Sequence, residues 1–493
     1  MARRELAVTI AAGVTGLTLL APGVASASGL SSARFGGEHG HPTTDNPTAL
    51  YYNPAGIASR RGTRIFVDAT MALRWASYER PASAVNSDLT LQEAPGANDG
   101  KATLFNTIAG PFAGATSDFG TKIFSAGAAA YFPFGGQAVW GRNSAYAGNK
   151  EIPGAVDGVQ RWYTIDGTIR SMYLTGGFAF RFPSVGLSIG VTGSAIKSGV
   201  NTIRARNADG SDDVLTAADT PGNLKEGRSM IDVSGWQAGF SAGALWEWRE
   251  KLWIGASYTS QPNVVGGMEL KGELVNVLGV AKPETTQVVL TQTLPDIIRL
   301  GFRVRPLPRL ELRVFGDYTR WSVFDKQCVM QNVEKRRCDF AGGETALDKP
   351  EGFGADTPTD PDNPDADPER FVVQHLPRFW KDAGGVRVGA SYWFLDSLEG
   401  YLGAGYDSSA IPVKTLDPAI YDMNKVSLSV GARWQVIRNL GLSLPFTEIL
   451  YMKVDTKGTN VLNKFKAPTR QASADGIYKQ SLSLFNLYAD VRF

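Results

Sequence analysis

The sequence predicts an all-β protein, a transmembrane β-barrel of fourteen antiparallel strands with an N-terminal plug on the periplasmic side. Three observations lead to this fold. Residues 485–493 end the chain in strict alternation, with apolar side chains on one face and polar ones on the other. The stretches with strand character are joined by links that alternate between long and short. The N-terminus has the pattern of an export signal, which places the chain outside the cytoplasm.

Residues 1–27 are predicted to be a secretory signal peptide. Two arginines, Arg3 and Arg4, precede an apolar run, and small residues follow at 25–27. The run is shorter than the ~20 apolar residues that cross a bilayer, so we expect export rather than retention in the inner membrane. The net charge of the whole chain is +2, and removal of this segment leaves it near neutral. Such a balance argues against nucleic acid as a partner.

Residues 28–62 do not alternate and are predicted to form a plug, here called the hatch. They precede the first strand, so they would lie at the periplasmic end of the barrel, and their mixed polarity would allow them to fill the lumen. They include Asn53-Pro54-Ala55-Gly56. Asn-Pro and Ala-Gly are also ordinary turn dipeptides, so a plain turn is the alternative interpretation.

Residues 63–493 are predicted to form the barrel. The fourteen strands are expected near residues 63–78, 101–110, 121–132, 160–181, 185–200, 230–247, 252–271, 284–304, 309–322, 383–394, 399–408, 424–434, 439–454 and 480–493. The last strand should pair with the first, which leaves no sheet edge exposed to lipid and both termini on the periplasmic side.

Arginines on the polar faces of these strands are expected to point into the lumen, because an arginine on the lipid face at mid-bilayer would cost ~2–4 kcal/mol. The interior should therefore be polar, with apolar exceptions such as Phe315 and Trp393. Asp317 and Asp490 offer partners for an arginine–acid ladder that stiffens the wall. The lumenal arginines are Arg299, Arg303, Arg313, Arg387 and Arg433.

The links between the strands fall into two classes. Long links lie at residues 79–100, 133–159, 201–229, 272–283, 323–382, 409–423 and 455–479. Shorter ones lie between them, at residues 111–120, 182–184, 248–251, 305–308, 395–398 and 435–438. Outer-membrane barrels have long extracellular loops and short periplasmic turns, whereas a soluble β-sandwich has no reason to sort its links in this way.

The longest link, residues 323–382, is predicted to be an extracellular loop. It contains Cys328 and Cys338, for which a disulfide is favoured over two free thiols or a metal pair in an oxidising compartment. Residues 356–369 hold six acids, four prolines and no base. This composition favours a solvated segment over a Ca²⁺ site, because the glycine turn and the distal glutamate of an EF-hand loop are missing.

Several motifs in the same order resemble the FadL-type family of outer-membrane transporters for long-chain fatty acids and hydrocarbons. Tyr51-Tyr52 followed by Asn53-Pro54-Ala55-Gly56 is similar to the hatch motif of that family. The resemblance covers essentially the whole mature chain and includes the number of strands, but the cysteine-containing, Asp/Pro-rich link differs from the family. The other motifs are Tyr131-Phe132-Pro133-Phe134-Gly135, Leu294-Pro295, Arg320-Trp321-Ser322-Val323-Phe324, Gly405-Tyr406-Asp407-Ser408 and Leu444-Pro445-Phe446-Thr447.

The resemblance implies passive uptake of a hydrophobic compound. The cargo would bind an apolar groove between extracellular loops, move to a site near the hatch, and leave sideways where the third strand kinks inward. Pro133 lacks a ladder donor and the glycines add flexibility, although Pro133 could simply end the strand. The kink is expected at Phe132, Pro133, Phe134, Gly135 and Gly136, and the gating residues of the hatch are expected to be Asn53, Pro54, Ala55 and Gly56.

The resemblance leaves the cargo open between a fatty acid and a hydrocarbon. A fatty acid brings a carboxylate, with which one of the lumenal arginines could pair. An aromatic hydrocarbon needs no such partner. A general porin for small solutes is the alternative function, and it would lack a plug.

Other classes are disfavoured. The three histidines, His39, His41 and His375, stand in no Ser/His/acid arrangement, so no enzyme is expected. His39 and His41 could form a metal pair, but no acid or cysteine cluster lies near them in the sequence, so neither a metal site nor a cofactor is expected. The expected location is the outer membrane of a Gram-negative bacterium. The expected partners are hydrophobic small molecules, outer-membrane lipid and lipopolysaccharide, and the barrel-assembly machinery, which would contact the strand that ends at Phe493. We expect a monomer.

Overall fold

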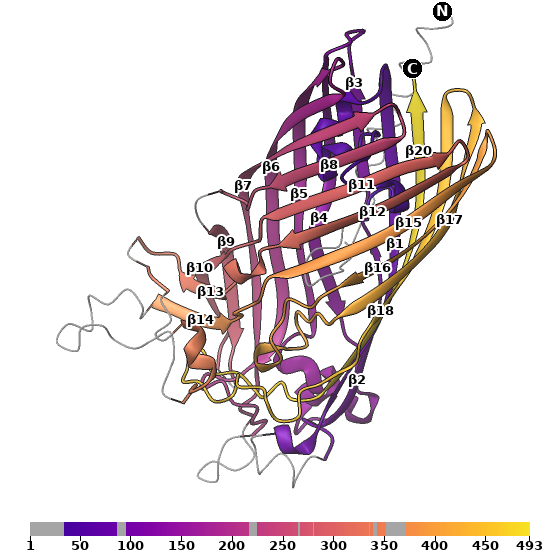
Figure 1. Ribbon diagram of the computed structural model, residues 1–493. Helices are drawn as coiled ribbons and strands as arrows, with labels where there is room; N and C mark the ends of the chain where they lie inside the picture. Colours follow the sequence, from indigo (N-terminus) through magenta and orange to yellow (C-terminus); the bar gives the residue numbers. More distant parts are fainter. Residues whose placement is uncertain are drawn as a thin grey trace, which may run out of the picture.

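The computed structural model describes residues 34–85, 95–215, 224–264, 267–279, 281–334, 336–338, 343–351 and 371–493. The predicted signal peptide and the acidic segment 356–369 lie outside these residues. The described strand segments form one 20-stranded sheet, which closes into a barrel of 14 antiparallel strands (Figure 1). The predicted fold class is confirmed.

Eight barrel strands are continuous, and the other six are each divided into two segments. The continuous ones are β1 (Thr63–Arg80), β4 (Phe124–Val139), β5 (Asp166–Phe182), β6 (Leu187–Arg206), β7 (Gly227–Trp248), β16 (Leu398–Asp407), β17 (Lys425–Ile437) and β20 (Ile477–Arg492). The divided ones are β2 (Gly100–Ala109) with β3 (Phe112–Ser117), β8 (Leu252–Thr259) with β9 (Met268–Val277), β10 (Glu284–Gln292) with β11 (Ile297–Leu307), β12 (Leu310–Thr319) with β13 (Lys326–Gln331), β14 (Val372–Pro377) with β15 (Ala383–Leu395), and β18 (Leu440–Tyr451) with β19 (Val454–Asp455).

The barrel closes between its first and last strands. β20 pairs antiparallel with β1 from Arg64↔Arg492 to Glu79↔Ile477, and it pairs with β18 on its other side. The predicted pairing of the last strand with the first is therefore confirmed. Short turns join the strands at the end where Phe493 lies, and this end is the periplasmic one.

The strand faces separate as the alternation predicts. On β11, Ile298, Leu300 and Phe302 are 52%, 47% and 43% exposed, so they form part of the lipid-facing surface. The intervening Arg299 and Arg303 are 5% and 6% exposed and point inward. The apolar outer face is compatible with the hydrocarbon of the bilayer, and the closed ladder provides hydrogen-bond partners for the backbone N–H and C=O groups.

Three expectations about strand boundaries were wrong. The predicted link 111–120 contains β3, because Gly110-Pro111 interrupts the second barrel strand without ending it. The predicted extracellular loop 323–382 contains β13 and β14, which pair with each other. The third strand does not stop at residue 132, since β4 continues through Pro133 to Val139, so Pro133 does not end it.

Four neighbouring barrel strands break at one level. The interruptions at 260–267, 293–296, 320–325 and 378–382 lie side by side, since Ile297 is opposite both Thr259 and Thr319, and Thr319 is opposite Ala383. Beyond this level, β9, β10, β13 and β14 continue the wall on the extracellular side (Figure 1). Cys328 and Cys338 form a disulfide there.

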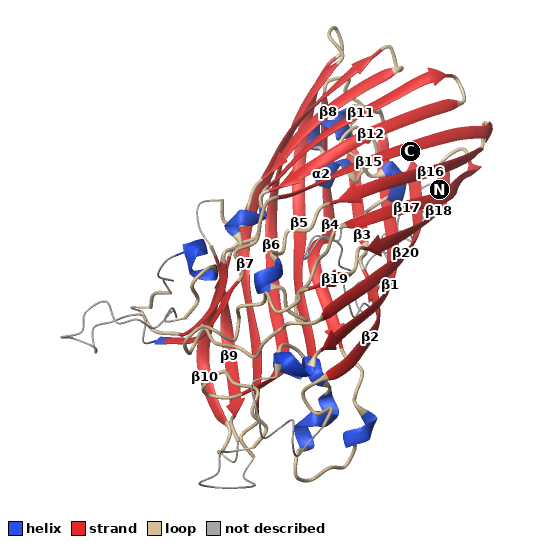
Figure 2. Cartoon of the chain, turned by 60° about the horizontal axis from the view of Figure 1, so that its bottom comes forward, coloured by secondary structure: helices blue, strands red, loops and turns tan. Residues whose placement is uncertain are grey.

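The remaining elements are short helical turns (Figure 2). No helix in the described ranges is long and apolar enough to cross a membrane. The turns are η2 (Gly37–His39), α2 (Ala49–Tyr52), η3 (Pro54–Ala58), η4 (Ala82–Ala84), η5 (Ser144–Tyr146), η6 (Pro153–Asp157), η7 (Val159–Trp162), η8 (Trp321–Val323), η9 (Gly343–Leu347) and η11 (Val413–Thr415).

Residues 34–62 lie inside the barrel. η3 contacts β4, β5, β6 and β7, while η2 contacts β16 and β18, so the segment reaches from one wall to another. Most of its residues are buried. The segment therefore occupies the lumen where the sequence predicts the hatch; its action as a gate stays a prediction.

Candidate functional site

Asn53 ties the hatch to the barrel wall. Its Nδ2 donates to the carbonyl oxygens of Pro42, at 2.8 Å, and Ala244 on β7, at 2.9 Å. Its Oδ1 accepts from the backbone N–H of Ala55 at 3.2 Å, which caps the N-terminus of η3, and Pro54 begins that turn. The side chain is fully buried, so each polar atom of Asn53 bonds within the protein.

Glycines of the wall allow this close approach. A Cβ at Gly190 would lie 2.6 Å from the carbonyl carbon of Pro54, and one at Gly243 would lie 2.1 Å from Oδ1 of Asn53. Within the hatch, a Cβ at Gly56 would lie 2.2 Å from the carbonyl oxygen of Thr44. The motif residues therefore fit a notch that only glycine-lined strands provide.

Polar side chains anchor the rest of the hatch. His39 bonds Oε1 of Glu399 at 2.8 Å and also contacts the hydroxyl of Tyr488. Ser257 donates to the carbonyl oxygen of Tyr52 at 2.6 Å. The histidine predicted as a weak metal candidate thus serves as a link between hatch and barrel.

An aromatic cluster joins the hatch to the third barrel strand. Phe35 of the hatch packs on Phe112 and Tyr131, with ring centroids 5.3 and 5.5 Å apart. Tyr51 packs on Tyr131 at 5.4 Å, and Tyr131 stacks on Tyr173 of β5 at 5.6 Å. The hatch therefore contacts β4 directly beside the sequence predicted to kink.

The wall is interrupted beside this cluster. β4 pairs with β3 as far as Tyr131↔Phe112, and its next bridge to the second barrel strand is Leu104↔Trp140. These two strands form no backbone ladder over residues 132–139, all of which the structure describes; at one end of this stretch the side chain of Asn106 accepts from the N–H of Val139 at 3.1 Å and donates to its carbonyl oxygen at 3.4 Å. The interruption, here called the wall gap, covers the predicted kink residues Phe132, Pro133, Phe134, Gly135 and Gly136.

A β-bulge on the edge of β4 that faces β5 accounts for the loss of pairing with the second barrel strand. Tyr131 is opposite Tyr173 and Phe134 is opposite Ser171, so Phe132 and Pro133 together face one residue of β5. Such an extra residue bends the bulged strand. Proline suits the site because it has no N–H to leave unpaired on the side of the gap.

The wall gap is apolar around Phe132 and polar farther along β4, where Arg74 donates to the carbonyl oxygen of Gln137 at 3.0 Å. Phe132 packs against a cluster from four strands of the same wall region: Ala72, Ile108, Ile449, Leu482 and Leu484. Phe134 turns into the lumen and packs on Tyr173 and on Trp321, each with a centroid distance of 6.3 Å.

The lumen is bridged by aromatic rings at this level. Trp321, Phe324 and Trp380 come from the breaks in the opposite wall and pack on one another at 4.7–6.2 Å. Through Phe134 they reach across to β4. These rings separate the extracellular side of the lumen from the hatch.

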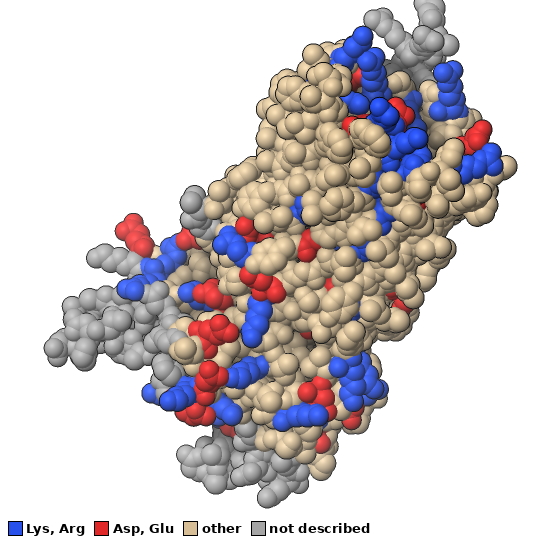
Figure 3. Space-filling model, viewed as in Figure 1, with Lys and Arg blue, Asp and Glu red and all other residues tan. Residues whose placement is uncertain are grey.

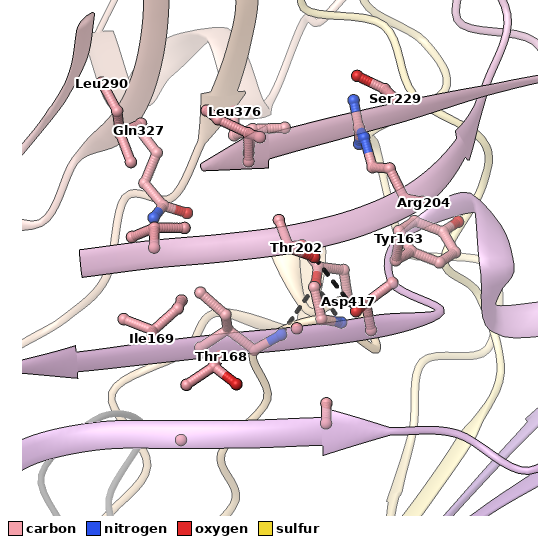
Figure 4. Close-up of a pocket in the computed structure, with 18 of the residues that line it drawn as sticks. Tyr163, Thr168, Ile169, Thr202, Arg204, Ser229, Leu290, Gln327, Leu376 and Asp417 are labelled. Atoms are coloured by element: carbon pink, nitrogen blue, oxygen red, sulfur yellow. Dashed lines mark hydrogen bonds between the residues drawn. The ribbon is translucent and has the colours of Figure 1, made fainter. Parts of the chain in front are cut away.

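A cavity of about 110 Å³ lies on the extracellular side of these rings, here called the lumenal cavity (Figure 4). Gly136, Gln137 and Ala138 of β4 line it, so the cavity and the wall gap share a strand. Its apolar lining is Ile169, Val200, Ile231, Leu274, Leu290, Val329, Leu376, Ala419 and Ile420.

The charged groups of the cavity are three arginines and Asp417. Arg378 donates to Asp417 at 2.5 Å and to Gln327 at 2.9 Å, and Arg74 donates to Gln480 at 2.9 Å.

Arg204 is held less firmly than the other two. Its recorded hydrogen bond is to Oε1 of Gln471, at 3.5 Å. It stands opposite Ser229 across β6 and β7, and Figure 4 shows the two side chains close together at one end of the cavity. Arg204 is therefore the cavity arginine best able to receive an anionic group.

Sequence reasoning missed Arg204. The sequence predicts a strand that ends at residue 200, which places Arg204 in the link that follows. β6 runs to Arg206, and the alternation of Val200, Thr202 and Arg204 along the cavity was the signal that could have found it.

The five arginines predicted to face the lumen do not line this cavity. Arg387 pairs with Asp317 at 2.9 Å and Asp407 at 2.5 Å. The others bond as follows: Arg433 to Asp490 (2.8 Å), Arg313 to Glu311 (3.3 Å), Arg299 to Thr259 (3.0 Å) and over the Tyr51 ring (4.5 Å), and Arg303 to Asp45 (3.6 Å). Arg313, Arg387 and Arg433 therefore fit the ladder interpretation, whereas Arg299 has no acidic partner in these contacts and Arg303 faces an acid of the hatch.

A second cavity, of about 460 Å³, lies between the hatch and the periplasmic rim and is here called the vestibule. Asp45 of the hatch is its central acid and contacts Arg60 at 3.0 Å, Arg64 at 3.5 Å and Arg303 at 3.6 Å. Burial alone would raise the pKa of Asp45, but Arg60, Arg303 and Arg64 hold that pKa well below its usual range. Asp45 is therefore ionised at any physiological pH.

Known proteins resemble the chain in sequence and in structure. The profile of the family described as outer membrane protein transport protein (OMPP1/FadL/TodX) matches residues 18–493. Outer membrane protein P1 of Haemophilus influenzae is 23% identical over 274 residues, which is 55% of this chain and 51% of that protein. The 47 kDa outer membrane protein of Pasteurella multocida is 23% identical over 283 residues, 54% of this chain and 52% of that protein. The chain thus spans about half the length of these relatives.

Solved structures share the fold. A FadL homologue from Pseudomonas aeruginosa superposes with a TM-score of 0.69 at 16% identity, covering 96% of this chain and 100% of that one. The Ralstonia pickettii toluene transporter TbuX gives 0.58 at 14% identity, covering 92% and 97%. At these identities the likeness establishes the barrel architecture.

Proposed function

Because the chain belongs to the OMPP1/FadL/TodX family of outer-membrane transport proteins, we propose that it takes up long-chain fatty acids or similar amphipathic carboxylates. The protein resides in the outer membrane, and its family carries hydrophobic compounds. The proposal concerns which compound enters and by which route it leaves.

The observation that carries the cargo proposal is the pairing of an apolar cavity with Arg204. Ten aliphatic or alanine side chains, Ala138 included, offer a surface for a hydrocarbon chain, since burial of apolar area drives such binding. Arg204 lies at one end with a single long hydrogen bond, whereas Arg378 is already neutralised by Asp417. A carboxylate would form an ion pair with the guanidinium of Arg204, and charge-assisted hydrogen bonds of this kind are strong.

An aromatic hydrocarbon is the second candidate. It would fill the apolar part of the cavity but leave Arg204 without an anionic partner. A general porin is less well supported, because the aromatic rings from Phe134 to Trp380 and the hatch both lie across the lumen.

The route that we propose ends at the wall gap. The cavity shares β4 with the gap, and the gap is lined by Phe132 and the apolar cluster around Ile108. A hydrophobic molecule that leaves there enters the bilayer without crossing water. Asn53, Pro54, Ala55 and Gly56 would act by holding the hatch, and with it Tyr51 and Phe35, against β4.

Binding to the purified protein in detergent tests the cargo proposal. Equilibrium dialysis with labelled oleate and labelled oleyl alcohol compares two ligands that differ in the head group. We expect the wild-type protein to bind oleate about tenfold more tightly, a difference of about 1.4 kcal/mol, and Arg204→Gln to lose that preference.

The matched control is Arg206→Gln, which removes the same charge from the same strand. Arg206 donates to the carbonyl oxygen of Val373 and does not line the cavity, so this variant should keep the preference. Equal affinity of the wild-type protein for the acid and the alcohol would overturn the carboxylate proposal.

A further inference from the structure

The vestibule is rich in arginine. Seven arginines line it, against four acidic side chains, which leaves a surplus of three positive charges. Asp490, which is buried behind the lining, pairs with Arg64, Arg433 and Arg492. Its negative charge reduces the surplus from three to two. The lining arginines are Arg60, Arg61, Arg64, Arg303, Arg305, Arg433 and Arg492, and the acids are Asp45, Glu311, Asp396 and Glu399.

The surplus is concentrated at the periplasmic end of the molecule. Figure 3 shows Lys and Arg gathered at the end where the chain terminates, whereas at the opposite end Lys and Arg are interspersed with Asp and Glu. Concave sites lined by one sign of charge focus the electric field and raise the local concentration of counter-ions. The vestibule is therefore suited to attract an anion from the periplasm.

Arg303 lines the vestibule, and one donor edge of its guanidinium is open in the sense that it has no acceptor within the described ranges. Its guanidinium lies 4.1 Å from the ring centroid of Trp253, which fixes its plane. One nitrogen, Nη1, faces Asp45 at 3.6 Å. Nε and Nη2 are buried and have no acceptor among the residues that the structure describes. Arg305 also leaves its Nε without an acceptor in the same part of the chain.

Buried donors without acceptors are costly, since each loses its hydrogen bonds to water. The Nε–Nη2 edge of a guanidinium matches two oxygens of an oxyanion in a bidentate pair. A monoanion would leave part of the charge surplus uncompensated, whereas a doubly charged phosphate matches it more closely.

We propose that the vestibule is a binding site for a phosphate oxyanion, seated on the open edge of Arg303 and surrounded by the arginines of the hatch and the rim. The same chemistry is offered by free phosphate in the periplasm and by the phosphate monoester of a lipid head group. This site is separate from the lumenal cavity and does not depend on the identity of the transported compound.

The proposed site joins two parts of the molecule. Arg60 and Arg61 belong to the hatch, while Arg303 and Arg433 belong to the wall. An anion bound between the hatch and the wall would add a second ionic link, beside the one that Asp45 of the hatch makes with Arg64 and Arg303 of the wall.

Equilibrium dialysis of the purified full-length protein in detergent with ³²P-labelled inorganic phosphate tests this site, at ionic strength held constant with chloride. We expect saturable binding to the wild-type protein and a loss of about tenfold in affinity for Arg303→Gln, which removes the bidentate edge. Arg61→Gln is a second variant, because Arg61 is exposed and its loss does not endanger folding; a loss of about two- to threefold is expected from the missing charge.

The matched control is Arg438→Gln, which removes an exposed arginine from a turn at the same end but outside the vestibule lining. It should bind phosphate like the wild-type protein. Competition by dihexanoylphosphatidic acid, which carries a phosphate monoester, would identify a lipid head group as the source, and absence of competition would identify free phosphate. Absence of saturable binding to the wild-type protein would overturn the proposal, as would equal affinity of wild type, Arg303→Gln and Arg61→Gln.

Discussion

At the scale of single residues, Asn53 shows how the hatch is fastened. It is fully buried, and it bonds the hatch to itself through Pro42 and Ala55 and to the barrel through Ala244. Alanine at this position would remove the side-chain hydrogen bonds to the carbonyl oxygens of Pro42 and Ala244 and to the N–H of Ala55. Each unsatisfied buried group costs about 1–3 kcal/mol.

Asn53→Ala should therefore loosen the hatch without preventing barrel assembly. We expect fatty-acid uptake by cells to fall while the amount of protein in the outer membrane stays the same, and the ion conductance of purified protein in planar bilayers to rise. Asn439→Ala, in an exposed periplasmic turn, is the control and should change neither quantity. Unchanged uptake by Asn53→Ala would contradict this role.

Asp45 predicts how the hatch responds to pH. Its pKa is held well below the usual range by Arg60, Arg303 and Arg64. A carboxyl with a depressed pKa in the folded state stabilises that state above the unfolded value of about 3.9, and the contribution is lost as the pH falls through the folded-state pKa.

The conductance of the wild-type protein should thus be the same at pH 7 and pH 5. Asp45→Asn, which removes the charge, should conduct more than wild type at both pH values. Planar-bilayer recordings over this range provide the measurement, and a rise in wild-type conductance between pH 7 and pH 5 would show that another group controls the hatch.

Residue roles were predictable from the sequence only where a motif marked them. Asn53 was found through its tetrapeptide, but its partners are backbone carbonyls of Pro42 and Ala244, which no side-chain pattern reveals. The inward direction of Arg299 and Arg303 followed from alternation. That Arg303 lies in the vestibule and Arg204 in the cavity depends on strand length and on the position of the hatch.

At the scale of elements, β4 is the part of the wall that departs most from a regular ladder. Its bulge places Phe132 and Pro133 against one residue of β5, and its other edge forms no backbone ladder with the second barrel strand from residue 132 to 139. The extra residue, rather than the proline itself, changes the direction of the strand.

Two variants at position 133 separate the effect of the extra residue from the effect of the proline ring. Deletion of Pro133 removes the extra residue, so β4 can pair with β2 and close the gap; uptake of labelled fatty acid should fall at least about tenfold with normal surface expression. Pro133→Ala keeps the residue count and should retain most of the uptake. Normal uptake by the deletion variant would show that the cargo leaves elsewhere.

Element boundaries followed the sequence where alternation was continuous. β16, β17 and β20 lie close to their expected ranges. β3, β13 and β14 were missed, because Gly110-Pro111 and the long segment around Cys328 have the composition of links, while pairing with distant strands decides their conformation.

At the scale of the whole molecule, four features follow one another along the barrel axis. The lumenal cavity lies on the extracellular side, then come the aromatic rings from Phe134 to Trp380, then the hatch, and then the vestibule. The wall gap lies beside the rings. The wall gap thus gives a hydrophobic cargo a lateral exit into the bilayer, whereas the path along the barrel axis leads through the charged vestibule.

Photo-crosslinking tests this route most directly. A fatty acid with a diazirine near the end of its chain would be added to cells that carry the protein, and the adducts would be mapped by peptide mass spectrometry after irradiation. The account predicts adducts on the cavity wall, at residues such as Ile169 and Leu290, and at the wall gap, at Phe132 and Ile108. Adducts in the vestibule, at Trp393 or Gln435, together with none at the gap, would show that the cargo passes the hatch and would contradict lateral exit.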